Sequence, residues 1–277
     1  MCIDWHRFIR DFLIKRFMDS EVIEKIMMRK EFSEIPLKDV ERALSFFPSD
    51  RFGDEERVKK TRDLLRRVYS GFGGRKLLLW KDKSAEEVLE KHLSTRERFL
   101  HYEEIYSRLL KGVDKKKISV IDLGAGVNGF SYDYFSKVGF KKVNYLGVEA
   151  VGQLVDLMNG YFKNQGLKSA RAVHESLFST SKIIDLISEM ESPRVIFMFK
   201  VVDSLEKLER NYTLRFLEAL KEIDFEKIVI SFATESWHRR KKFYVQRTWL
   251  INFIRENFSF MDDFTLGGER YVVFGKK

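Results

Sequence analysis

The sequence predicts an α/β fold in which a mostly parallel sheet follows an N-terminal all-helical domain. Before residue 90, apolar residues recur at spacings of three and four, which is typical of helices. After residue 118, short apolar runs alternate with helical stretches, which is the pattern of a doubly wound sheet. A chain of 277 residues is also long enough for about two domains. We therefore expect a helical, basic domain over residues 1–90 and a sheet domain over residues 91–277.

Helices are expected throughout the N-terminal region. Val22, Ile23 and Ile26 place apolar side chains on one face of a helix. Residues 54–69 form a second predicted helix, which is rich in basic side chains, and the glycine-rich run 70–75 marks a break after it. Ser84 is expected to cap a further helix, because serine accepts a hydrogen bond from the first turn.

The second half of the chain is expected to contain strands joined by helices. A helix is predicted between the last two strands, over residues 245–258, and Gly267 and Gly268 are expected to form the turn into the final strand. The alternation predicts a Rossmann-like architecture. The predicted strands are residues 118–123, 143–148, 170–174, 194–199, 227–232 and 270–274.

Basic residues are concentrated in two segments. The chain has 51 Lys and Arg against 42 Asp and Glu, a net charge of +9. Residues 57–81 hold nine basic residues and one acid, so most of the excess lies there. A second run, Arg239-Arg240-Lys241-Lys242, lies among aromatic residues such as Trp237. Cations beside aromatic rings suit phosphates and stacked bases, which favours a nucleic-acid partner. Solvated basic helix faces in a charge-rich, thermophile-like chain are the alternative.

The composition and the N-terminal residues argue against several other classes of protein. The single cysteine, Cys2, excludes an internal disulfide framework and zinc sites built from paired cysteines. No run approaches the length of about eighteen apolar residues that a membrane span requires, and the N-terminus lacks the pattern of a signal peptide. We therefore expect a cytoplasmic protein, acting as a monomer, with no membrane contact and no metal.

A glycine-rich turn follows the first predicted strand. The run from Val120 to Gly129 reads VIDLGAGVNG, which satisfies the G-x-G-x-x-G pattern. Glu149 ends the next strand, where an acid can accept hydrogen bonds from two ribose hydroxyls. This arrangement suits a nicotinamide dinucleotide or S-adenosylmethionine, and a glycine turn without a cofactor is the alternative. The preceding basic helical region favours methyl transfer to nucleic acid over hydride transfer.

Several segments after residue 91 together resemble the aminoglycoside-resistance 16S ribosomal RNA methyltransferases, which methylate guanine N7. The most specific segment is His92-Leu93-Ser94-Thr95-Arg96-Glu97-Arg98, which is similar to a His-x-Ser-Thr-(Lys/Arg)-Glu-Arg segment just ahead of the methyltransferase domain. Tyr106 matches a tyrosine after it. The other similar segments are residues 121–128, 195–200, 230–234 and 267–271.

The resemblance implies a class I, Rossmann-like methyltransferase that binds S-adenosylmethionine. Arg98 would hold the methionine carboxylate through its planar guanidinium, and Glu175 would lie near the adenine amine. The alternatives are a surface ion pair of Arg98 with Glu97 or Glu103 and a solvated loop position for Glu175. The residues expected to bind the cofactor are His92, Arg98, Gly124, Ala125, Gly126, Asn128, Glu149, Ala150, Glu175, Ser176, Phe199 and Lys200.

The partner implied is ribosomal RNA or the assembled small ribosomal subunit. Ser231, Phe232 and Thr234 would contact the target nucleotide, and Phe232 either stacks on an extruded base or belongs to the core. No catalytic residue is expected, because guanine N7 already carries a lone pair and needs no general base. The residues expected to bind RNA are Lys59, Lys60, Arg62, Arg66, Arg67, Arg239, Arg240, Lys241 and Lys242.

The chain departs from the family pattern at three places. Gly129 replaces a proline, Ala233 and Glu235 replace a proline and an arginine, and residues 237–242 replace a glycine-rich loop. With the thermophile-like composition, we expect an archaeal or thermophile-like homologue that modifies RNA routinely rather than conferring resistance. The alternatives are an RNA-binding or ribosome-assembly factor without methyl transfer, a methyltransferase acting on another RNA, and a nicotinamide-dependent oxidoreductase.

Overall fold

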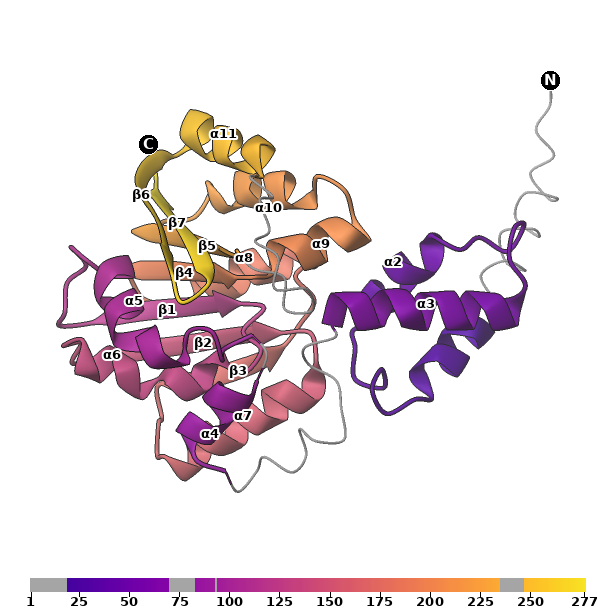
Figure 1. The fold of residues 1–277 in the computed structure, drawn as a ribbon, viewed down its shortest axis with the longest axis horizontal. Helices are drawn as coiled ribbons and strands as arrows, with labels where there is room; N and C mark the ends of the chain where they lie inside the picture. The colour runs from indigo at the N-terminus through magenta and orange to yellow at the C-terminus, as the bar shows by residue number, and fades with distance from the viewer. Residues whose placement is uncertain (1–18, 70–82, 93, 235–246) are drawn as a thin grey trace.

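The computed structural model describes residues 19–69, 83–92, 94–234 and 247–277. Its centre is a seven-stranded sheet, in which β1 to β5 are parallel and β7 runs antiparallel to both of its neighbours (Figure 1). In spatial order the strands are β3 (Ala170–His174), β2 (Val143–Glu149), β1 (Ile118–Leu123), β4 (Arg194–Phe199), β5 (Lys227–Ala233), β7 (Glu269–Gly275) and β6 (Ser259–Leu266).

All six predicted strands are confirmed, with ends that differ by one residue at most. The prediction was wrong in omitting β6, which forms a hairpin with β7 through the expected turn at Gly267 and Gly268. A register shift between Phe260 and Asp262 breaks the alternation of this strand. Because alternation is the main sequence signal for a strand, a bulged edge strand escapes it.

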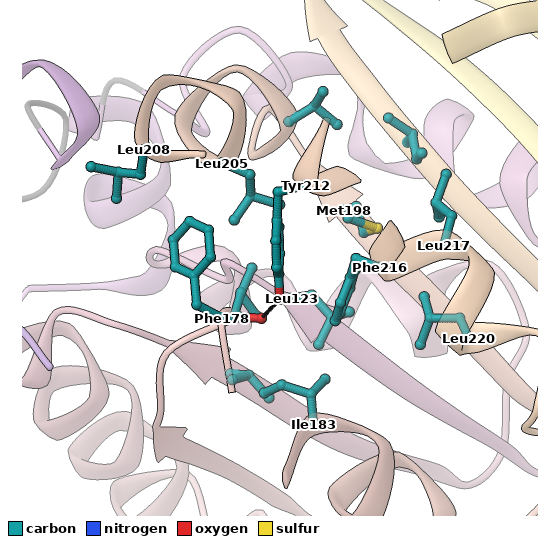
Figure 2. Close-up of a cluster of buried hydrophobic side chains, with 14 of the residues drawn as sticks. Leu123, Phe178, Ile183, Met198, Leu205, Leu208, Tyr212, Phe216, Leu217 and Leu220 are labelled. Atoms are coloured by element: carbon teal, nitrogen blue, oxygen red, sulfur yellow. Dashed lines mark hydrogen bonds between the residues drawn. The ribbon is translucent and has the colours of Figure 1, made fainter. Parts of the chain in front are cut away.

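Helices cover both faces of the sheet. Those on one face are α8 (Thr180–Ser188), α9 (Val202–Leu208), α10 (Tyr212–Leu220) and α11 (Thr248–Asn257). Those on the other are α4 (Ala85–Lys91), α5 (Tyr102–Leu109), α6 (Asp133–Lys137) and α7 (Gly152–Asn164). Figure 2 shows part of the apolar core between the sheet and helices α8 to α11, where Phe216 and Met198 are fully buried. Burial of each such side chain contributes about 1.5–3 kcal/mol.

The N-terminal helices lie beside the sheet, toward the ends of its strands (Figure 1). Residues 19–27 are helical, followed by α2 (Leu37–Ser45) and α3 (Asp54–Tyr69), whose predicted range is confirmed. Ser84 caps α4 as expected, in a reciprocal capping box with Glu87. Val88 and Leu89 of α4 belong to the core under α5 and α7, so this helix packs with the sheet. The division at residue 90 stays a prediction.

Candidate functional site

A glycine turn joins β1 to the short 3-10 turn η3 (Asn128–Ser131) and lies against the end of β2. Gly124 has φ +73° and Gly126 has φ +58°, which is backbone that glycine adopts without strain. A Cβ at Gly124 would also lie 2.7 Å from a methyl carbon of Val201. The sequence therefore needs glycine here for both conformation and space.

Glu149 closes this turn with its carboxylate. Gly126 donates its backbone N–H to one carboxylate oxygen over 2.8 Å, and Val151 donates to the other over 2.9 Å. The side chain is 4% exposed, and burial raises the pKa of Glu149 although the backbone donors oppose the shift. Each oxygen can accept a second hydrogen bond. Glu149 is thus positioned to bind two neighbouring hydroxyls, as a ribose presents them.

A cavity lies at the carboxyl ends of β1, β2 and β4. This is the edge of an open α/β sheet where ligands bind. Five of the residues expected to bind the cofactor line it, and they come from these three strand ends: Gly124, Glu149, Ala150, Phe199 and Lys200. The remaining lining residues are Asp39, Val68, Tyr69, Leu177, Phe178, Val201, Ser204, Leu205 and Leu208.

A buried ion cluster, made of Arg98, Glu269, Lys200, Glu97 and Ser231, lies next to the cavity. Arg98 is 2% exposed and donates to Glu269 over 2.9 Å. Lys200 Nζ lies 3.4 Å from the other oxygen of Glu269 and also pairs with Glu97. Ser231 donates to Glu269 and accepts a hydrogen bond from the backbone N–H of Lys200. The cluster joins the segment before β1 to the ends of β4, β5 and β7.

Charge and burial set the protonation of this region. Burial alone would raise the pKa of Glu269, but Arg98 and Lys200 lower it below its ordinary value. Burial would lower the pKa of Arg98, but Glu269 raises it well above its ordinary value. Burial and the charges of Arg98 and Lys200 lower the pKa of His92 to about 3. At neutral pH Arg98 and Glu269 are therefore both charged beside a neutral His92, whose Nδ1 lies 2.7 Å from the Ser94 hydroxyl.

Residues 56–255 match the family of ribosomal RNA methyltransferases described as FmrO. This match covers far more than half of the chain and contains the glycine turn, Glu149 and most of the buried ion cluster. The chain belongs to the FmrO ribosomal RNA methyltransferase family. The predicted family and the predicted enzyme class are thus confirmed.

Individual relatives agree with this assignment. A 16S rRNA (guanine(1405)-N(7))-methyltransferase of Proteus mirabilis is 21% identical over 202 residues, which are 71% of this chain and 67% of that protein. An rRNA methylase from Escherichia coli superposes with a TM-score of 0.72 and 16% identity over 93% of this chain and 99% of its own. The 16S rRNA methyltransferase RmtF, in complex with S-adenosyl-L-homocysteine, gives a TM-score of 0.70 and 20% identity over 93% of this chain and 98% of its own. These structures confirm the predicted Rossmann-like fold.

Several predicted cofactor residues of this FmrO-family methyltransferase lie beside the cavity without lining it. Asn128 is 1% exposed and donates to Asp122 over 2.7 Å, while its amide oxygen accepts a hydrogen bond from Tyr102 over 2.7 Å. Asn128 therefore supports the glycine turn from the protein interior and does not face the cavity. Gly126 donates its backbone N–H to Glu149, and His92 and Ala125 are buried.

Arg98, Glu175 and Ser176 also lie outside the set of described residues that line the cavity. The alternative of a surface ion pair for Arg98 with Glu103 is wrong, because its guanidinium is buried against Glu269 and lies 4.7 Å from the Phe199 ring centroid. Glu175 pairs with Lys182 at 3.2 Å, as a partly solvated acid.

The predicted target-base residues are less accessible than expected. Ser231 is fully buried in the ion cluster, so its hydroxyl serves Glu269. Phe232 is 4% exposed, belongs to the core and has the Arg247 guanidinium 4.3 Å from its ring centroid, which favours the core interpretation. Thr234 is partly exposed at the end of β5 and is the one of the three that a ligand can reach in this structure.

The predicted RNA-binding residues of α3 differ in whether their side chains already have partners within the protein. Arg62 donates to the backbone carbonyls of Lys25 and Ile26, Arg66 pairs with Glu31 and Asp63, and Lys60 pairs with Glu56. Lys59 and Arg67 are exposed and remain available for phosphates. Arg239, Arg240, Lys241 and Lys242, with Glu235, lie outside the described residues.

Sequence reasoning missed Glu269 as a partner and missed Asp39 and Tyr69 as cavity residues. A signal existed only for Glu269, which sits inside the resembling segment 267–271. Within the described ranges there is no helix long and apolar enough to cross a membrane. The same residues contain no group of three or more side chains arranged to hold a metal ion.

Proposed function

We propose that this enzyme transfers the methyl group of S-adenosylmethionine to N7 of a guanine in the 16S RNA of the small ribosomal subunit. The observation that carries the proposal is the strand-end cavity closed by Glu149, in a chain of a ribosomal RNA methyltransferase family. The name of the Proteus mirabilis relative supports the atom and the RNA. We also propose that the protein acts as a monomer in the cytoplasm, where the subunits lie.

The residues present fit S-adenosylmethionine. The wall of the cavity is mostly apolar and contains Leu177 and Phe178, which suit a purine base. Glu149 offers acceptors for ribose hydroxyls. Arg98 Nε has no hydrogen-bond partner among the described residues, so the guanidinium keeps a donor for a carboxylate. The complex of RmtF with S-adenosyl-L-homocysteine supports the same cofactor.

The chemistry requires positioning more than acid or base catalysis. When bound, the cofactor supplies an electrophilic methyl group. Guanine N7 is a neutral nucleophile with a free lone pair, so the protein has no proton to remove. The rigid glycine turn and Glu149 would fix the cofactor, and the strand ends would hold the guanine in line with the methyl group. Arg98 and Lys200 would bind the methionine carboxylate. Glu269, which pairs with both cations, would hold them in position.

RNA binding is assigned to the exposed cations of the N-terminal helices. Lys59 and Arg67 would contact phosphates, which fixes the register of the enzyme on folded RNA without reading sequence. The run Arg239 to Lys242 would flank the target nucleotide. Ala233 ends β5, and Thr234 precedes this run by a few residues along the sequence.

The test is transfer of labelled methyl from S-adenosylmethionine to assembled small subunits, to protein-free 16S RNA and to transfer RNA. We expect label in one guanine of the 16S RNA, recovered as 7-methylguanine after nuclease digestion and mass spectrometry. Subunit binding without any label would favour an assembly factor, and label only in transfer RNA would place the substrate elsewhere.

A charge-reversal variant separates RNA binding from cofactor binding. The double variant Lys59→Glu and Arg67→Glu is expected to lower methylation of subunits at least about tenfold, because phosphate contacts dominate affinity. Affinity for S-adenosyl-L-homocysteine, measured by calorimetry, should be unchanged. The matched control is Lys141→Glu with Lys142→Glu, which makes the same charge change at exposed positions before β2, at the opposite ends of the strands.

A further inference from the structure

The N-terminal helices form part of the cavity wall. Asp39 from α2, with Val68 and Tyr69 from the end of α3, lines the same cavity as Gly124 and Glu149 of the sheet. A region expected to bind only RNA therefore also lines the cavity that is predicted to bind the cofactor.

Asp39 is the polar group of this wall. It is 1% exposed, and its carboxylate accepts hydrogen bonds from the hydroxyls of Tyr69 and Ser176. A carboxylate has about four acceptor positions, so it can accept further donors from a ligand. Burial is the main cause that raises the pKa of Asp39. The hydroxyls of Tyr69 and Ser176 offset part of the cost of burying this acid, and a donor from a ligand would offset more of it.

Asp39 lies on the part of the cavity wall that would face the base of a bound nucleoside. If Glu149 holds the ribose, the base lies on an adjoining surface of the cavity, and that surface includes Leu177 and Phe178 just after β3. Ser176, the partner of Asp39, directly precedes them. An apolar slot with one carboxylate at its edge suits a purine that carries an exocyclic amine.

The helices are also fixed to the sheet on two sides of the cavity. On one side, Ser204 of α9 donates to the carbonyl of Val68 over 3.0 Å. On the other, the backbone N–H of Gly152, at the start of α7, donates to the carbonyl of Glu34 over 3.2 Å. The exposed Arg67 directly precedes Val68 at this attached end of α3. The cavity wall and the surface proposed to bind RNA therefore belong to the same helix.

We propose that Asp39, held by Tyr69 and Ser176, reads the exocyclic amine of the cofactor's adenine and thereby couples cofactor binding to RNA docking by the N-terminal helices. The inference rests on the proposed function, because it takes S-adenosylmethionine as the ligand. It adds a specificity residue from outside the sheet and a thermodynamic link between the two substrates.

Calorimetry with two ligands tests the first part. S-Adenosylhomocysteine carries the amine, and its 6-oxo analogue S-inosylhomocysteine does not. The wild-type protein is expected to prefer S-adenosylhomocysteine by at least about tenfold, the effect of a hydrogen bond to a buried charged group. Asp39→Asn should weaken S-adenosylhomocysteine binding by about tenfold and remove the preference. Equal selectivity in Asp39→Asn and wild type would overturn the assignment.

Two further variants keep the test decisive. Glu41→Gln makes the same charge change at an exposed position of the same helix and should leave both affinities unchanged. If melting curves show that Asp39→Asn is unfolded, Tyr69→Phe replaces it, since the loss of one donor frees Asp39 to turn from the cavity. We expect it to lower the selectivity severalfold, and unchanged selectivity would count against the proposal. A wild-type protein that binds neither ligand would instead refute the proposed function.

Affinity for small subunits tests the coupling. S-Adenosylhomocysteine should tighten wild-type binding to subunits, and subunits should tighten cofactor binding by the same factor, as linkage requires. In Asp39→Asn this factor should fall to one, while Glu41→Gln keeps the wild-type value. A wild-type subunit affinity that does not depend on S-adenosylhomocysteine would overturn the coupling.

Discussion

The buried ion cluster and the surface ion pairs of α3 use the same residue types in opposite surroundings. The side chains of Arg98 and Glu269 are 2% and 0% exposed, whereas Arg66, which pairs with Glu31, is 40% exposed. Water competes for the α3 pairs and screens them, so each contributes little to stability. Around Arg98 and Glu269 water is excluded, and removing the charge of one leaves the other as a buried charge that has lost its partner. Burial therefore decides which ion pair the fold depends on.

The largest expected effect comes from breaking the cluster. Glu269→Gln keeps the shape of the side chain but leaves Arg98 without its counter-charge, and it should lower the free energy of unfolding by about 3–5 kcal/mol. Urea denaturation at neutral pH measures this loss. Asp263→Asn is the matched control, because Asp263 pairs with Arg270 in the same hairpin with side chains that are 24% and 30% exposed. Equal losses in the two variants would contradict the comparison.

The pH dependence of stability gives an intermediate effect. His92 has a pKa of about 3 in the folded protein, against 6.5 for an ordinary histidine. As the pH falls from about 6.5 to about 3, the unfolded chain takes up a proton that the folded one does not. Stability therefore falls in this window, by at most about 1.4 kcal/mol per pH unit from this residue.

His92→Gln isolates that contribution, since glutamine cannot be protonated but can still bond the Ser94 hydroxyl. The difference in free energy of unfolding between wild type and variant should shrink or reverse from pH 7 to pH 4, and urea titrations at each pH measure it. The buried acids Asp39, Asp122 and Glu149 titrate in both proteins and cancel in the difference. Parallel pH curves would mean that burial and the neighbouring charges do not hold His92 neutral.

The smallest effect is expected at the surface of α3. Glu31→Gln removes the partner of Arg66 and should change the free energy of unfolding by less than about 1 kcal/mol. The effect should shrink further at high salt, since exposed pairs are screened. Repeating the urea titration at low and high ionic strength checks both statements. A loss comparable with that of Glu269→Gln would remove the distinction between the two regions.

The sequence predicted well what is local. Strands β1, β3 and β4 are found at their predicted ends, because each is a short, fully or largely apolar run with a clear break after it. The glycine turn and Glu149 were also recognised, since both follow strands and their spacing is fixed by the chain. The bulge in β6 hid that strand, because a single extra residue reverses which side chains face the core.

Pairing across the fold could not be predicted in this way. Arg98 was recognised by its segment, but its partner Glu269 lies 171 residues later, and the packing of whole elements brings the two together. The same holds for Asp39, whose place in the cavity depends on how α2 sits against the sheet. The number of basic residues in α3 overstated how many cations are available to RNA. Arg57, for example, is buried against the Phe47 carbonyl and two aspartates.

The distance along the chain between Arg98 and Glu269 also has a consequence for folding. Strands β1 to β5 all precede the hairpin that carries Glu269, and the ion cluster is complete only when that hairpin packs beside them. Until then Arg98 and Lys200 lack their shared counter-charge, and contacts so far apart in sequence form late and slowly. The ion cluster beside the cavity is therefore one of the last parts of the site to be completed as the chain folds.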